Sequence, residues 1–226
     1  SLQLKAQGFW TATNGVYGGT AKEIINHAAT GSLVTVTDGG IFRSTDNGNT
    51  WSRSVSGIVS TDNVILGLAQ DNAGKLYCNS LQRVYSSADG GLSWSQVTTV
   101  TNNFFGPYLK VSPANGNIFV TNSSTNQILR STDNGQTFSA TTFSASNISD
   151  IEINSSGQVM VSVSGQSAVY ISTNNGVSWT AMSSGTYTGF PAININYTYK
   201  LATDATGNLY VLTDLGPYRL AAGATA

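Results

Sequence analysis

Acidic side chains are the residues with the clearest potential for chemistry in this sequence. The 226-residue chain holds 11 Asp and Glu, 10 Lys and Arg and one His. Hydrolysis of a glycosidic bond needs two carboxylates that face one cleft. Asp38 and Asp214 are one pair that could meet, because each follows the second strand of a predicted repeat. Other carboxylates lie in predicted strands or turns: Glu23, Glu152, Asp71 and Asp204. Catalysis by such a pair is one hypothesis for the function of this chain, and it is not our main prediction. We assign no catalytic residue.

Metal and nucleophile chemistry have even fewer candidates. His27 is the one histidine, and no set of ligand-type residues surrounds it in the sequence, whereas a zinc site needs three or four ligands. Cys78 is the one cysteine and lies in a strand-like segment, where a small buried core residue is the expected role. We therefore predict no metal and no cofactor.

A motif of type Ser-x-Asp-x-Gly-x-x-aromatic occurs four times. A short Asp or Asn side chain can close a tight turn by accepting backbone N–H groups, and the Gly that follows can take positive φ. The aromatic residue then opens the next strand and buries a large apolar face. We interpret the motif as structural. Its residues are Ser44, Asp46, Gly48 and Trp51; Ser87, Asp89, Gly91 and Trp94; Ser131, Asp133, Gly135 and Phe138; Ser172, Asn174, Gly176 and Trp179.

The spacing of the motif predicts the fold. Successive copies begin between 41 and 44 residues apart, a period typical of four-stranded propeller blades. A fifth repeat stops before its motif, and the segment around Trp10 resembles the strand that is missing. We therefore predict one all-β domain over residues 1–226, a five-bladed β-propeller of four-stranded blades. The N-terminal strand, near Gln3 to Thr13, is expected to complete the last blade. A fragment of a larger ring is the alternative.

The four motifs resemble the Asp-box (BNR) repeats of sialidases, sortilin-type receptors, xyloglucan-cleaving hydrolases and photosystem assembly factors. This resemblance implies a β-propeller and says little about function, because one fold hosts many activities. Sialidases of this kind are expected to carry an Arg triad, a Tyr nucleophile with a Glu partner, and an Arg-Ile-Pro motif. No arginine here is followed by Ile-Pro, which disfavours sialidase activity.

Aromatic residues in the connections between repeats are the candidate ligand contacts. Aromatic rings can stack on sugar rings while neighbouring Asn, Ser and Thr bind hydroxyl groups. The alternative is that these rings fill the space between blades. The candidates are Tyr17, Phe104, Phe105, Phe143, Tyr187 and Phe190.

Composition and charge indicate which partners and which location to expect for this chain. Only 9% of residues are charged and the net charge is −1, so nucleic-acid binding is not expected. No apolar run is long enough to enter a membrane. The chain starts at Ser1 without Met, and we expect a piece of a larger multidomain protein that is secreted, periplasmic or at the cell surface. Our main prediction is a non-catalytic recognition or adhesion module for a glycan or a protein. A glycoside hydrolase, sialidase-like or other, and a structural assembly scaffold are the alternatives.

Overall fold

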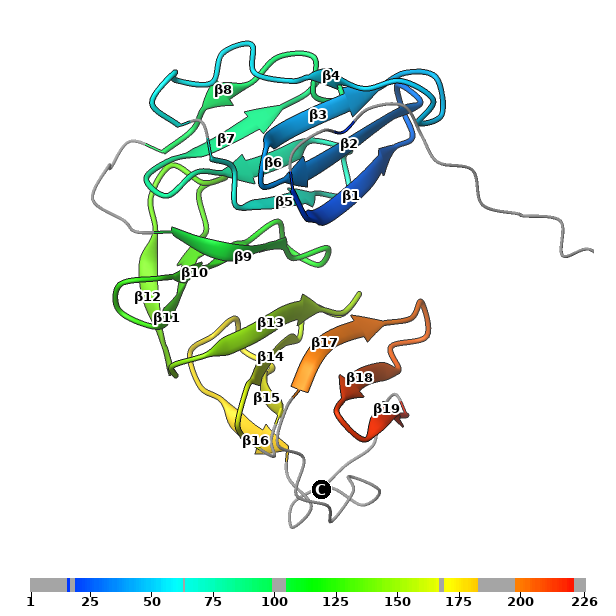
Figure 1. The fold of residues 1–226 in the computed structure, drawn as a ribbon. Coiled ribbons are helices and arrows are strands. Elements are labelled where there is room, and N and C mark those ends of the chain that lie inside the picture. The colour runs from blue at the N-terminus through cyan, green and yellow to red at the C-terminus, as the bar shows by residue number, and fades with distance from the viewer. Residues whose placement is uncertain are drawn as a thin grey trace, which may run out of the picture.

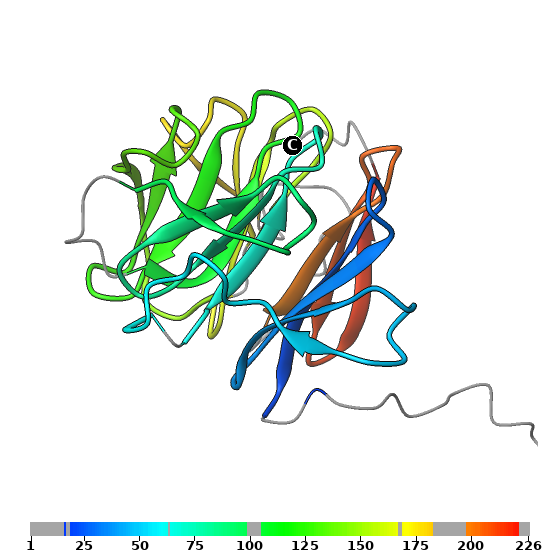
Figure 2. The same ribbon diagram turned by 90° about the horizontal axis from the view of Figure 1, so that it is seen from above.

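The protein is an all-β ring of five antiparallel sheets (Figures 1 and 2). The structure, a computed structural model, describes residue 16 and residues 19–62, 64–98, 105–166, 169–182 and 198–221. Every regular element in these ranges is a strand. The predicted five-bladed β-propeller is therefore confirmed.

Each sheet is built from strands that follow one another in the chain. In the described ranges, four sheets have four strands and the fifth has three. The first two sheets are β1 (Ala21–His27), β2 (Ser32–Thr37), β3 (Gly40–Ser44) and β4 (Ser52–Arg53), then β5 (Gly67–Gln70), β6 (Leu76–Asn79), β7 (Val84–Ser87) and β8 (Ser95–Gln96). The third and fourth are β9 (Phe105–Val111), β10 (Ile118–Asn122), β11 (Gln127–Ser131) and β12 (Ser139–Ser144), then β13 (Ile148–Ile153), β14 (Val159–Val163), β15 (Val169–Ser172) and β16 (Thr180–Met182). The fifth is β17 (Thr198–Thr203), β18 (Leu209–Thr213) and β19 (Gly216–Leu220).

The apolar cores lie between neighbouring sheets. Alternate residues of a strand point to opposite faces, so a strand between two sheets can contribute to two cores. In β6, Cys78 faces the core shared with the first sheet, and Tyr77 faces the core shared with the third. The first strands β1, β5, β9, β13 and β17 pack side by side in that order. They therefore form the inner wall of the ring.

The strand expected to close the ring lies outside the described residues. Gln3 to Thr13 fall in that part of the chain. The fifth sheet buries Leu209 and Val211 against the fourth, while Tyr210 and Leu212 on its other face are exposed. Closure by the N-terminal strand remains a prediction.

The same pattern of hydrogen bonds occurs within each of the four motif turns. In the first, the Ser44 hydroxyl donates to Asp46 Oδ1 at 2.8 Å and accepts the Gly48 N–H at 2.9 Å. Asp46 also accepts the N–H and the hydroxyl of Thr50, at 2.9 and 2.6 Å. In the fourth turn Asn174 Oδ1 accepts the Ser172 hydroxyl at 3.0 Å and the Ser178 N–H at 2.9 Å. The network thus needs an oxygen at this position and works without its charge.

Left-handed backbone in these turns explains a second sequence preference. The residue before the motif Gly has positive φ in each of the four copies, and Asn and Gly adopt this conformation at the least cost. These residues are Asn47, Gly90, Asn134 and Asn175. The turn type is therefore fixed by two successive residues rather than by the Gly alone.

The carboxylates of the turns are held ionised by their hydrogen bonds. For Asp46, the Thr50 hydroxyl is the main reason that the pKa falls from 3.8 to about 2. Burial opposes ionisation of Asp89 and Asp133, but hydrogen bonds from Ser93 and Thr137 outweigh it and again lower the pKa to about 2. Because these pKa values are lower than in the unfolded chain, the three carboxylates stabilise the fold above pH 4 and lose this contribution as pH falls towards 2.

We predict that the triple variant Asp46→Asn, Asp89→Asn, Asp133→Asn loses less stability between pH 5 and about pH 2 than the unmodified chain. Asn174 shows that an amide fits this turn. Urea unfolding midpoints at several pH values measure the difference. Parallel pH curves for the two proteins would contradict the assigned role of the carboxylates.

The motif aromatics differ in burial, and we expect their removal to differ in cost. Trp94 is 3% exposed in the core between the first two sheets, and its indole N–H donates to Ser54 Oγ at 2.8 Å. Trp51 is only half-buried. Trp94→Ala should cost about 3–5 kcal/mol of stability because it leaves a cavity, and Trp51→Ala clearly less. Urea denaturation measures both, and equal losses would refute this ranking.

Candidate functional site

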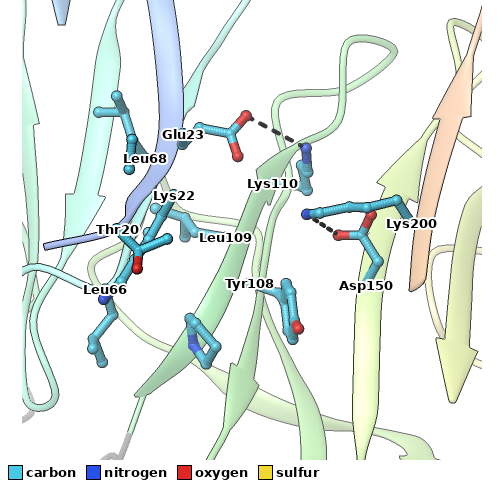
Figure 3. Close-up of a pocket in the computed structure, with 13 residues that line it drawn as sticks. Thr20, Lys22, Glu23, Leu66, Leu68, Tyr108, Leu109, Lys110, Asp150 and Lys200 are labelled. Atoms are coloured by element: carbon cyan, nitrogen blue, oxygen red, sulfur yellow. Dashed lines mark hydrogen bonds and ion pairs between the residues drawn. The ribbon is translucent and has the colours of Figure 1, made fainter. Parts of the chain in front are cut away.

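Charged side chains gather where the inner strands converge. A pocket of ≈ 470 Å³ lies between β1, β9, β13 and β17, and we call it the axial pocket. Its charged lining residues are Lys22, Glu23, Lys110, Asp150 and Lys200. A second pocket of ≈ 300 Å³ shares these five and reaches Tyr108 and Leu66. Figure 3 shows this shared region, with Glu23 and Asp150 each joined to a lysine.

Strand alternation places these charges. In β13, Ile151 and Ile153 belong to the core between the third and fourth sheets, so Asp150 and Glu152 point away from that core. In β9, Lys110 lies between two buried apolar residues. These charged groups therefore lie on the strand faces opposite to the apolar residues, and Lys110 and Asp150 line the axial pocket.

Lys110 connects two carboxylates from different sheets. Its Nζ lies 3.5 Å from Glu152 Oε2 and 4.0 Å from Glu23 Oε1. The Thr203 hydroxyl donates to Glu152 Oε1 at 3.2 Å. The first, third, fourth and fifth sheets thus contribute to one polar cluster.

Asp150 and Lys200 form a second pair beside it. Lys200 Nζ lies 3.4 Å from Asp150 Oδ1, and the Leu201 N–H donates to Asp150 Oδ2 at 3.0 Å. The same ammonium lies 5.7 Å from the centre of the Tyr108 ring. Asp150 is thereby fully engaged, whereas Lys200 is largely exposed.

The environment separates the two glutamates. Burial raises the pKa of Glu152, and the attraction of Lys110 offsets only part of this effect. Burial alone would lower the pKa of Lys110, but Glu23, Glu152 and Asp150 outweigh it and raise that pKa. The Glu152 side chain is 19% exposed and that of Glu23 is 36% exposed. Burial thus favours the protonated form of Glu152, and Glu23 is the more accessible carboxylate.

The two carboxylates of the predicted pair Asp38 and Asp214 both lie in turns. Asp38 lies in the β2–β3 turn, where it accepts the Thr20 N–H at 3.1 Å and pairs with Lys22 at 3.0 Å. Asp214 lies in the β18–β19 turn and is exposed. Glu23 and Glu152 form a further candidate pair, since both contact Lys110. Charges within the first strands were the sequence signal for it, because those strands meet at the axis.

Two of the six candidate loop aromatics lie in strands. Phe105 begins β9, is 0% exposed and packs edge-on against Phe138 with ring centres 5.1 Å apart. The expectation that it reaches a ligand from a protruding loop is wrong, because it is needed in the core between sheets. Phe143 lies in β12 and is also buried. The other four, Tyr17, Phe104, Tyr187 and Phe190, fall outside the described residues.

The described ranges contain neither a metal-binding cluster nor a membrane-spanning helix. No group of three or more His, Cys, Asp or Glu residues with metal-binding geometry occurs there. Within the same ranges no helix is long and apolar enough to cross a membrane. Cys78 and His27 are both buried strand residues.

This propeller is similar to known proteins that differ in function. A family model described as Sortilin-Vps10 (Sortilin, neurotensin receptor 3) matches residues 82–190. A xyloglucanase of Hypocrea jecorina (strain QM6a) is 37% identical over 84 residues, which are 35% of this chain and 10% of the relative. The chain thus matches about a tenth of that enzyme's length.

Solved structures share the fold at low sequence identity. An ancestral GH74 enzyme has a TM-score of 0.64 at 19% identity, over 87% of this chain and 28% of that one. The GH74 xyloglucanase from Xanthomonas campestris has a TM-score of 0.64 at 19% identity, over 87% and 34% of the two chains. YCF48 bound to D1 peptide has a TM-score of 0.63 at 17% identity, over 93% and 67%. These matches establish the β-propeller fold.

The comparisons correct our main functional prediction. We expected a non-catalytic recognition or adhesion module, but the curated relative is a xyloglucanase and GH74 enzymes are among the structural neighbours. The alternative of a glycoside hydrolase is therefore better supported. The sequence prediction paired the turn carboxylates Asp38 and Asp214 and assigned no role to Glu23 and Glu152, which lie in first strands.

Replacing Lys110 tests how the cluster is held together. Lys110→Met removes the cation between two carboxylates, and we predict a loss of about 1–3 kcal/mol at pH 7. The loss should shrink as pH falls, because protonation of Glu152 relieves its unpaired charge. Urea denaturation at pH 5, 6, 7 and 8 measures this, with Lys22→Met as the control. A loss that does not change with pH would contradict the pairing.

Proposed function

We propose that this chain is part of an extracellular glycoside hydrolase that acts on a neutral glucan of the xyloglucan type. The observation that carries the proposal is the pair Glu23 and Glu152, which approach one lysine from two sheets. The similarity to a xyloglucanase supports the choice of substrate class. The four motif turns act as Asp-boxes that build the scaffold, and the chain is one part of a larger multidomain protein.

The contacts with Lys110 set an upper limit on the separation of the two glutamates. One oxygen of each lies near Lys110 Nζ, so these oxygens are no further apart than the sum of the two distances to it. Two-carboxylate glycosidases keep their carboxyl groups about 5 to 9.5 Å apart, with the shorter spacing for retention and the longer for inversion. The axial pocket has a volume of ≈ 470 Å³, within the usual range for small-molecule sites, and Glu23 lines it. Glu152 adjoins this lining through its contact with Lys110.

The two glutamates take different parts in bond cleavage. Glu152, whose pKa is raised by burial, donates its proton to the oxygen of the leaving sugar. Glu23 is more accessible and supplies the negative charge, either as nucleophile at the anomeric carbon or as base for a water molecule. Lys110 holds both side chains in place. A neutral glucan needs no metal or organic cofactor for this reaction.

The neighbouring residues bind and orient the sugar. Lys200 is exposed at the pocket, where its ammonium donates hydrogen bonds to sugar hydroxyl groups. Tyr108 offers a half-buried ring in the adjoining pocket. Such a combination of an aromatic face and a few polar groups is typical of ligand sites.

Hydrolysis of xyloglucan by the 226-residue chain tests the proposal. Reducing ends released over time should fall by about 10²–10⁴-fold in Glu152→Gln, since a general acid contributes about that much, and by a similar factor in Glu23→Gln. Asp38→Asn is the matched control and should keep the rate. The activity should also decline as pH rises and Glu152 loses its proton.

Two results would refute this assignment. One is full activity in both glutamine variants while circular dichroism shows them folded. The other is the absence of any product from xyloglucan and from unsubstituted β-glucan under conditions in which the chain is folded. Activity lost in Asp38→Asn but kept in Glu152→Gln would return the reaction to the turn carboxylates.

A further inference from the structure

A further pocket, which we call the junction pocket, lies where the third and fourth sheets meet, away from the axis. Its volume is ≈ 660 Å³, and its aromatic residues are Phe143 on β12, Tyr170 on β15 and Trp179 at the start of β16. The Phe143 ring centre is 5.1 Å from that of Tyr170 and 4.9 Å from that of Trp179. β12 and β16 are the outer strands of their sheets (Figure 1). This junction pocket shares no lining residue with the axial pocket and is separate from it.

The second sheet contains the same aromatic pair in a covered state. Tyr85 and Trp94 occupy the positions of Tyr170 and Trp179 relative to the motif, and they are 0% and 3% exposed. The connection from β4 to β5 contacts both residues of this pair through Ser56 and Val59. The backbone N–H of Trp94 donates to Ser56 O at 2.8 Å, and the Val59 N–H donates to the Tyr85 hydroxyl at 3.4 Å.

In the fourth sheet the corresponding connection is too short to do this. β12 ends at Ser144 and β13 begins at Ile148. Tyr170 and Trp179 are therefore only half-buried and line the pocket wall. Phe143, which is buried, supports them from the third sheet. An aromatic pair that serves as core in one blade thus becomes accessible surface in another.

The polar residues that line the junction pocket indicate which kind of ligand fits it. None of the residues that line the junction pocket is charged. Its polar groups are hydroxyls and one amide, and the Tyr170 hydroxyl donates to Gln166 Oε1 at 2.5 Å. A phosphate, carboxylate or ammonium group would find no counter-charge among these residues. A ligand with an apolar ring face and many neutral hydroxyl groups matches them best.

We propose that the junction pocket binds a pyranose ring of a neutral oligosaccharide, stacked against Tyr170 and Trp179. The Gln166 amide and the serine hydroxyls bind the sugar's hydroxyl groups. This is a binding site additional to the axial pocket. It rests on the proposed function only where the sugar is taken to belong to the hydrolysed polymer.

Calorimetric titration of the 226-residue chain tests the site. The probes are xyloglucan heptasaccharide, cellotetraose, xylotetraose and mannotetraose. We expect at least one to bind, and Tyr170→Leu to weaken that binding about tenfold. Leu is a suitable replacement because Leu129 occupies the same position in the third sheet. Gln166→Ala, at an exposed position, should weaken binding without affecting folding. Tyr210→Leu, an exposed tyrosine on the fifth sheet, is the matched control.

The outcomes separate this site from the axial one. Binding that survives in Glu23→Gln and Glu152→Gln but is weakened in Tyr170→Leu supports the junction pocket, even if no sugar is hydrolysed. Binding that is lost in the glutamine variants and unchanged in Tyr170→Leu and Gln166→Ala overturns it and leaves the hydrolase proposal intact. Failure of all four oligosaccharides to bind also overturns it.

Discussion

The burial of both faces of each sheet against its neighbours is the constraint on which this structure depends. A strand in the middle of a blade has no free face, so its residues are committed to one core or the next. The first strands are different, because they border the centre of the ring. Polar residues such as Glu23, Lys110 and Glu152 can occupy them without disturbing the cores. The packing that makes the ring therefore also determines where chemistry can occur.

The sequence carries the fold more clearly than the site. The turn around Asp46 is local, since every partner of that carboxylate lies within four residues, and local chemistry repeats visibly along the chain. The period between turns then gives the blades. Lys110 and its two carboxylates come from three blades, and alternation within a strand says which face a residue takes but not what it meets there.

Phe105 illustrates the limit at the level of one residue. It stands between Asn102, Asn103 and Pro107, a composition typical of a loop, yet β9 already begins at Phe105 and its ring fills a core. Tertiary packing overrides local composition at such strand ends. The pairing of Glu23 and Glu152 could not be predicted from the sequence, because a charged residue inside a strand pattern is ordinarily assigned to a solvated face.

The contrast between residues 54–66 and the short link after Ser144 has an evolutionary consequence. Lengthening a flexible connection costs little entropy, about 0.6 kcal/mol for each doubling. A lineage can therefore seal or unseal an aromatic surface at any single blade by insertion or deletion, without touching the motif that holds the blade. Each junction of such a ring is an independent place to gain specificity, and rings of common ancestry can diverge in what they recognise while their scaffolds stay alike.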